Sequence, residues 1–357
     1  MIPFTDLQSQ YQDAKQDIDA AIARVIQENS FITGPLVEEV EESLIKYTGA
    51  EACASCGSGT TALQIALMAC GVGPSDEVIT VSHTFVSTPE AVVNCGATPV
   101  FCDIDEYYHM DLDQVEGLIN PQTKAILWVD TYGQTPDIER LAELAKKHNL
   151  YTIADAAHSF GYSYKNRRVG TLADLTCVSF NPVKNLGAMG DAGCVLGRAD
   201  LIERAKMFRN HGRNTRFDYE YIGINARIDN MQAVVVQAKL KHFDRWVARK
   251  REIAKYYSNN LSNQFQVPLE RSWGDHSFYV YVIETDKRDA LQKHLYDKGI
   301  QTNIHYANPC HTTQAFSPWY RKLPETERRV DRILSIPLYF SLTDSQIDHI
   351  VDSLRNF

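Results

Sequence analysis

Residues 178–197 read VSFNPVKNLGAMGDAGCVLG, with a single lysine, Lys184, near the centre. Two short apolar runs, LTCVSF and GCVLG, flank a loop of Asn, Pro, Gly and this lysine. Such runs between turn residues predict two buried strands. A lysine in a tight loop between buried strands loses solvation, which lowers its pKa and supplies the neutral amine that a Schiff base requires. Taken alone, the stretch leaves an ordinary loop lysine as the alternative.

On both sides of this stretch, β-prone runs alternate with helical patterns. The helical candidates are residues 88–95, 112–119 and 138–147. This alternation predicts an α/β protein, with a mostly parallel sheet between helices and ligands at the carboxyl ends of its strands. The candidate strands are residues 76–81, 98–104, 123–130, 150–156, 175–180 and 193–197.

The two ends of the chain have a different pattern. Residues 8–27 have helical periodicity, and a second helix is expected between Pro35 and a C-cap glycine, Gly49. Residues 230–261 form a long helical pattern without breakers, followed by a compact α+β pattern. A chain of 357 residues is longer than a single hydrophobic core usually accommodates. We therefore expect a large domain over residues 1–240 and a smaller C-terminal α+β domain over residues 241–357.

Composition narrows the class of protein. The chain is 44% hydrophobic and 23% charged, with a net charge of -9 and no block of like charge. Nucleic-acid binding is not expected, because a duplex-binding protein usually has a basic face. No run is long enough to span a bilayer, and the N-terminus lacks a basic start and an apolar segment. A soluble, reduced, cytoplasmic protein without membrane association is the expectation.

The eight cysteines mostly lie inside apolar runs, where a free thiol behaves as a small hydrophobe. Cys53 and Cys56 form a C-x-x-C, but no second pair or histidine spacing accompanies it. A zinc site is therefore not expected, and no other metal site is predicted. A redox pair is the weaker alternative.

Four features carry groups that could bind a ligand or react, and each stands at the end of a separate apolar segment. GSGTTAL, residues 57–63, opens a helix with flexible backbone and hydroxyls, which favours an anion. Phe85 offers a flat face for stacking, and Asp155 ends an apolar run where a carboxylate needs a cationic partner, such as a protonated pyridine nitrogen. Lys184 is the fourth, with the hydroxyl of Ser179 just upstream. Singly, Phe85 could be a core residue and Asp155 a helix cap.

Together, these motifs resemble the DegT/DnrJ/EryC1/StrS family of pyridoxal-phosphate-dependent nucleotide-sugar aminotransferases, nearly from end to end. The resemblance implies fold type I, a large domain with a mostly parallel seven-stranded sheet. The motifs are FITGP (31–35), GSGTTAL (57–63), DEVITVSHTF (76–85), GATPVFCDID (96–105), TYGQTPD (131–137), ADAAHSFG (154–161), SFNPVKNLGAMGDAG (179–193), GINARIDNMQA (223–233) and IHY (304–306).

The resemblance also implies roles for individual residues. Lys184 would form the Schiff base with pyridoxal 5'-phosphate and move the proton between cofactor and substrate. Asp155 would keep the pyridine nitrogen protonated, Phe85 would stack on the ring, and His158 would lie beside the cofactor. By the same resemblance, the phosphate would contact Gly59, Thr60, Ser179 and, from the neighbouring subunit of a homodimer, Asn225, while Arg227, His305 and Tyr306 would face the sugar nucleotide.

Among members that differ in the sugar carbon they aminate, the chain looks most like those that act on carbon 3. GINARIDNMQA is closer to their pattern than to that of carbon-4 members, and Arg227 suits a sugar carboxylate. The implied reaction moves an amino group from L-glutamate to a UDP- or dTDP-linked 3-keto sugar, such as UDP-2-acetamido-3-keto-glucuronate, for surface polysaccharide such as O-antigen.

Three other readings stay open or are disfavoured. A carbon-4 aminotransferase and a non-catalytic cofactor-binding regulatory protein remain alternatives. The family's dehydratases carry His in place of the lysine, so Lys184 argues against them. Three places depart from the family pattern. Asp130 stands where many members have His, His158 stands where Gln is common (a substitution that other members share), and NPCH (308–311) differs from the usual pocket rim.

Overall fold

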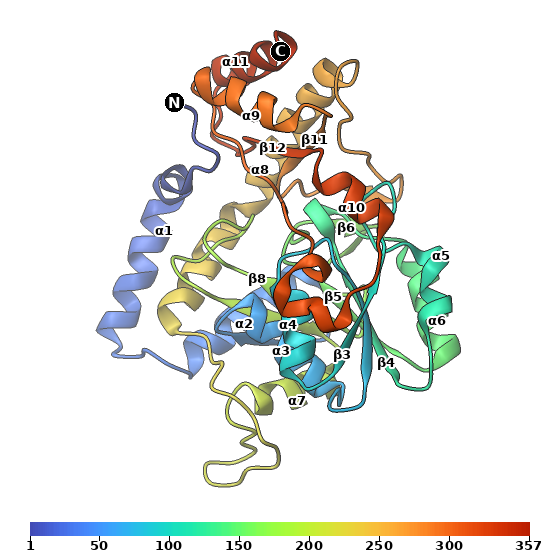
Figure 1. Cartoon of the computed structure of the whole chain (residues 1–357). Helices are drawn as coiled ribbons and strands as arrows, with labels where there is room; N and C mark the ends of the chain where they lie inside the picture. Colours follow the sequence, from blue (N-terminus) through green and yellow to red (C-terminus); the bar gives the residue numbers. More distant parts are fainter.

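In the computed structural model, which describes residues 1–357, a seven-stranded sheet forms the centre of the molecule (Figure 1). Its strand order is β1-β9-β8-β5-β4-β2-β3. Only β9 runs against its neighbours, and the remaining adjacent pairs are parallel, so the mostly parallel seven-stranded sheet is confirmed. The strands are β1 (Ala52–Cys56), β2 (Glu77–Val81), β3 (Thr98–Cys102), β4 (Thr123–Val129), β5 (Tyr151–Asp155), β8 (Leu175–Ser179) and β9 (Gly193–Gly197).

Six of these strands lie within the runs expected from the sequence. The seventh, β1, comes from the apolar segment before the Gly/Ser/Thr turn, which the alternation had not marked as a strand. β8 and β9 pair directly, so the loop that carries Lys184 connects two neighbouring antiparallel strands. Lys184 is therefore held at the edge of the sheet where β8 ends.

Helices cover both faces of the sheet, because each face presents its own buried apolar cluster. One cluster packs α3 (Gly59–Ala69), α4 (Ser87–Asn94) and α7 (Ala199–Phe208) against the strands. The other face packs against helices from four parts of the chain. These are α1 (Leu7–Gln27), α2 (Pro35–Thr48), the short α5 (Leu112–Val115) with α6 (Ile138–His148), and the first half of α8 (Asn230–Leu261).

Helix α8 runs without a break for 32 residues and joins the two ends of the molecule (Figure 1). Phe243 and Trp246 pack into the core beside the sheet, whereas Tyr257 and Leu261 pack into the C-terminal core. The boundary that we expect at residue 240 falls inside this helix, and the division into two domains stays a prediction.

The C-terminal part contains an antiparallel pair, β11 (Tyr281–Glu284) and β12 (Ile333–Ile336), with α9 (Arg288–Asp297) and α11 (Asp344–Arg355) packed on it. Both termini lie at this end of the molecule (Figure 1), where a bridge joins Ile2 to Ile300. The other elements are α10 (Pro324–Val330), a small sheet of β10 (Gly274–Asp275), β6 (Ser163–Tyr164) and β7 (Arg167–Arg168), and four short 3-10 helices, Glu116–Leu118, Thr131–Gly133, Cys310–Thr312 and Gln314–Trp319. None of the helices combines the length and hydropathy that a membrane crossing requires.

Candidate active site

A cavity of about 430 Å³ opens at the carboxyl ends of β1, β2, β5 and β8. Parallel strands end at one edge of a sheet, so residues far apart in the sequence meet there. Nine of the eleven residues singled out in the sequence line this cavity: Gly59, Thr60, Phe85, Asp155, His158, Ser179, Lys184, His305 and Tyr306.

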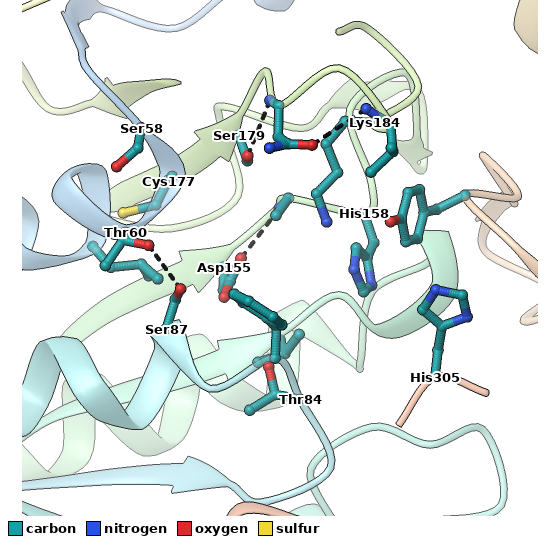
Figure 2. A pocket seen from close by; sticks show the side chains of 18 of the residues that line it. Ser58, Thr60, Thr84, Ser87, Asp155, His158, Cys177, Ser179, Lys184 and His305 are labelled. Carbon is teal, nitrogen blue, oxygen red and sulfur yellow. Dashed lines mark hydrogen bonds between the residues drawn. The ribbon is translucent and has the colours of Figure 1, made fainter. Parts of the chain in front are cut away.

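Lys184 projects from the β8–β9 loop toward Asp155 and His158 (Figure 2). Its Nζ lies 4.3 Å from the centre of the Tyr279 ring. Burial lowers the pKa of Lys184 to about 8, and the nearby charge of Asp155 only partly opposes this shift. At pH 7 about a tenth of the amine is therefore neutral and able to act as a nucleophile, far more than for an ordinary lysine.

Two buried lysines of α8 hold the loop that carries Lys184. Lys239 Nζ donates to the Gly187 carbonyl at 2.5 Å, and Lys250 Nζ donates to Asn185 Oδ1 at 2.7 Å. Burial lowers the pKa of Lys250 to about 7. Lys250 Nζ also donates to the Tyr279 carbonyl at 3.2 Å, so this lysine connects the loop to the segment that carries Tyr279.

Asp155 ends β5 and is buried, with no cationic side chain in an ion pair with it. Thr88 Oγ1 donates to its Oδ2 at 2.7 Å, and the Ala157 N–H donates to its Oδ1 at 3.2 Å. Burial raises the pKa of Asp155, while these hydrogen bonds and the charge of Lys184 oppose the rise. A buried carboxylate of this kind suits a cationic partner inside the cavity, such as a protonated pyridine nitrogen.

The opposite end of the cavity is built for an anion. Ser58 caps α3 by accepting from the Thr61 N–H at 3.1 Å, and Thr60 Oγ1 lies 2.7 Å from Ser87 Oγ (Figure 2). A Cβ added to Gly59 would lie 2.6 Å from Ser179 Cβ, so only glycine allows the helix to approach β8 this closely. The first-turn N–H groups and the hydroxyls fit a phosphate, and Lys184 with Asp155 fits the ring of pyridoxal phosphate.

The remaining wall of the cavity is aromatic. Tyr279 stacks on His158 with ring centres 4.2 Å apart, and Tyr306 Oη lies 3.2 Å from His158 Nε2. Phe85 stands at the rim, with a ring centre 6.0 Å from that of Tyr306. Burial lowers the pKa of His158 well below its usual range and that of His305 to about 4, so both rings are neutral.

Asn225 and Arg227 lie outside this cavity. Arg227 Nε donates to Asn225 Oδ1 at 3.1 Å, and Arg227 lines a separate hollow beside α2. Asp130 does not line the cavity either: it is buried behind the wall, where it accepts from Trp128 Nε1 at 2.9 Å and from Ser159 Oγ at 2.5 Å. The preceding residue, Val129, lines the cavity instead.

Among the residues of the site that sequence reasoning missed, Thr88 and Tyr279 are the most informative. Thr88, which orients Asp155, lies in the motif around Phe85, and its place in the first turn of α4 was a usable signal. Tyr279 lies in SFYVYVIET, an apolar pattern that indicates a core strand and gives no hint of a site. Only the packing of this segment against His158 brings Tyr279 into the cavity.

Comparison with protein families identifies the chain. The model of the DegT/DnrJ/EryC1/StrS aminotransferase family matches residues 12–355. The chain belongs to this family. Its members include nucleotide-sugar transaminases, so the resemblance drawn from the motifs is confirmed, and the protein is an aminotransferase.

Two curated relatives show the breadth of the family. The UDP-2-acetamido-2-deoxy-3-oxo-D-glucuronate aminotransferase of Pseudomonas aeruginosa is 37% identical over 359 residues, covering 100% of both chains. A protein of Geobacillus stearothermophilus named pleiotropic regulatory protein is also 37% identical, covering 100% of this chain and 98% of its own.

Solved structures agree with the fold. DesV of S. venezuelae, whose crystal structure is in complex with a ketimine intermediate, superposes with a TM-score of 0.97 at 36% identity. The match covers 99% of this chain and 98% of that one. The chain therefore has the fold of the type I pyridoxal-phosphate-dependent aminotransferases, as expected.

Proposed function

We propose that this protein is a pyridoxal-phosphate-dependent aminotransferase that moves an amino group from L-glutamate to a keto-sugar nucleotide. The observation that carries the proposal is a partly neutral lysine amine, Lys184, in one cavity with a buried Asp155 that has no ion-pair partner and with the N-terminus of α3 at Gly59. When bound, pyridoxal phosphate accepts the amino group from the donor, stabilises charge at the reacting carbon and passes the group to the acceptor.

Each residue then has a role set by its chemistry. The carboxylate of Asp155, oriented by Thr88, holds a proton on the pyridine nitrogen. The first-turn amides of α3 with Thr60 and Ser179 bind the phosphate, and Phe85 stacks on the ring. Lys184 Nζ bonds the cofactor, and its pKa near neutrality lets it both accept and return the proton at the substrate carbon.

For the acceptor we propose a UDP- or dTDP-linked 3-keto sugar, such as UDP-2-acetamido-3-keto-glucuronate. The GINARIDNMQA segment and the Pseudomonas relative, which acts on a 3-oxo-glucuronate nucleotide, support carbon 3. The guanidinium of Arg227 can bind a sugar carboxylate in a bidentate pair. The product would serve cytoplasmic synthesis of amino sugars for surface polysaccharide, such as O-antigen. A carbon-4 keto sugar is the alternative acceptor.

We also propose a homodimer with shared active sites. Asn225 and Arg227 lie outside the cavity of their own chain, next to the loop that extends from the body between α7 and α8 (Figure 1). This loop exposes Ile222 at 92% and Phe217 at 81%. Large exposed apolar side chains favour a protein interface. In such a dimer, Asn225 would reach the phosphate and Arg227 the sugar nucleotide in the partner's cavity.

The regulatory alternative is motivated by the name of the Geobacillus relative. A protein that binds the cofactor without catalysis has no need of a free amine with a depressed pKa. Because both Lys184 and Asp155 are in place, catalysis is the stronger proposal.

The test follows the absorbance of the purified protein with its cofactor. L-glutamate should bleach the yellow colour, and a UDP-linked 3-keto sugar should restore it, with a matched 4-keto sugar as the control acceptor. Restoration by the 4-keto sugar alone would reject carbon 3. A yellow protein that does not respond to glutamate, to other amino acids or to either acceptor would reject the aminotransferase and support the regulatory alternative.

A further inference from the structure

A three-residue turn after β4, Thr131–Gly133, lies where the large sheet meets the C-terminal segments. Its central residue, Tyr132, is buried and has a φ of +62°, a left-handed conformation that a bulky residue rarely adopts. Such strain persists only where surrounding contacts over-determine it, and these sites often serve function. The hydrogen bonds of Tyr132 show which parts of the molecule hold it in this conformation.

The side chain of Tyr132 ends in an ordered chain of hydrogen bonds. Its hydroxyl donates to the carbonyl of His305, which can only accept. The same oxygen must therefore accept from His83 Nε2, 2.7 Å away. Burial lowers the pKa of His83 to about 3, so this ring is neutral, with its proton on Nε2 and with Nδ1 unpaired. The chain runs in one direction, from His83 through Tyr132 to His305.

The backbone of the same turn holds two other cavity residues. The Tyr132 N–H donates to His158 Nδ1 at 3.3 Å, and the Tyr132 carbonyl accepts from the Tyr279 N–H at 2.9 Å. Because Nδ1 of neutral His158 accepts, its Nε2 carries the proton and faces Tyr306 Oη at 3.2 Å. The hydroxyl proton of Tyr306 is then free to point into the cavity.

We propose that Tyr132 is a positioning residue that sets the substrate-side wall of the active site, fixing the His305–Tyr306 segment through its hydroxyl and His158 and Tyr279 through its backbone. Tyr132 does not line the cavity, so it acts through these residues. The kinetic test of this role rests on the proposed function, because it needs a sugar-nucleotide substrate, whereas the structural test does not.

The experiment compares Tyr132→Phe with Tyr108→Phe. The two rings are in edge contact, with centres 5.0 Å apart, and both are buried. The Tyr108 hydroxyl donates a hydrogen bond to Glu284, away from the cavity. Tyr108→Phe is therefore the matched control, because it also removes a buried hydroxyl but leaves the hydrogen bonds of Tyr132 in place. Both variants should lower the melting temperature by a few degrees. Only Tyr132→Phe should raise KM for the sugar nucleotide, by about tenfold, with a smaller change in kcat and an unchanged cofactor spectrum.

A second readout needs no substrate. In crystal structures of the two variants, the His305 carbonyl and the Tyr306 ring should shift measurably, on the order of 1 Å, in Tyr132→Phe and stay in place in Tyr108→Phe. Equal KM values in the two variants, or an unmoved His305–Tyr306 segment, would overturn the proposal. A wild type without activity on any keto-sugar nucleotide would defeat the proposed function, while the crystallographic comparison would still decide the role of Tyr132.

Discussion

The cofactor side and the substrate side of the cavity are built in different ways. On the cofactor side, Asp155 and Ser179 end β5 and β8, whereas Gly59 and Lys184 lie just beyond the ends of β1 and β8, so strands of one sheet place all four residues. On the substrate side, His158, Tyr279 and the His305–Tyr306 segment come from separate parts of the chain and meet through the turn around Tyr132. Each cofactor-side residue lies in a short sequence motif at the end of a strand. The substrate-side wall depends instead on packing between segments that are far apart in the sequence. Changes on the cofactor side should therefore abolish chemistry, and changes on the substrate side should mainly alter affinity.

The largest effect is expected for Lys184→Ala. Losing the proton-transfer group alone costs on the order of 100- to 10,000-fold in kcat, and the covalent bond to the cofactor is lost as well. The phosphate cup and Asp155 remain, so the variant should fold and retain cofactor noncovalently. Stopped-flow kinetics and the cofactor spectrum are the measurements. Lys184→Arg is the control that keeps the charge and should be equally inactive, and multiple turnover in either variant would contradict the role.

Asp155→Asn should give the next largest loss. An amide cannot hold the pyridine nitrogen protonated, and removing one charge of a buried pair should lower kcat roughly 100- to 1,000-fold. The exposed Asp191 at the cavity rim, changed to Asn, is the matched control, and its kcat should stay near that of the wild type. Wild-type rates in Asp155→Asn would show that another group stabilises the cofactor's charge.

These cofactor-side residues could be predicted because alternating patterns mark the ends of parallel strands. The substrate side was less accessible from the sequence. Tyr279 lies in an apolar strand pattern. Tyr132 was visible only as part of a motif, because its hydrogen bonds to His305 and Tyr279 join segments more than 100 residues apart. β1 was hidden because its sequence, ACASC, contains none of the β-branched or aromatic residues that are typical of strands. Local periodicity thus predicted the strands of the sheet, whereas the substrate-side wall of the cavity depends on tertiary contacts that the sequence pattern does not reveal.

A smaller effect is expected for Arg227→Ala, which tests whether the substrate side extends into a partner subunit. Loss of a charge-assisted contact should weaken the sugar nucleotide by on the order of 10- to 100-fold. At substrate concentrations where Arg227→Ala is nearly inactive, we expect its mixture with Lys184→Ala to regain activity. A hybrid dimer with shared sites carries both defects in one site and none in the other.

After complete exchange of equal amounts, half of the dimers are hybrids, so the activity should approach about a quarter of the wild-type value. Native mass spectrometry can verify that the subunits have exchanged. Verified hybrids without recovered activity would place Arg227 and Lys184 in the same chain's site and contradict the shared-site dimer.

The smallest effect on activity is expected for Asp130→Asn, the position where many relatives carry His. Asp130 is buried between the two sides of the site, behind Val129, and burial raises its pKa to about 8. At pH 7 the side chain is mostly a neutral acid. An amide of the same shape can accept from Trp128 Nε1 and donate to Ser159 Oγ, so kcat and KM should stay within about twofold of the wild type.

The free energy of unfolding of Asp130→Asn should nevertheless depend on pH differently from that of the wild type. Because the pKa of Asp130 is raised in the folded state, the folded protein binds more protons than the unfolded chain between about pH 4 and pH 8, and wild-type stability falls across this range. Asp130→Asn lacks that loss, so its free energy of unfolding relative to the wild type should rise steadily from pH 4 to pH 8 and then level off. Urea unfolding at several pH values measures the difference. A pH-independent difference would mean that Asp130 is ionised in the folded protein, and a large loss of kcat at pH 7 would mean that its charge reaches the active site.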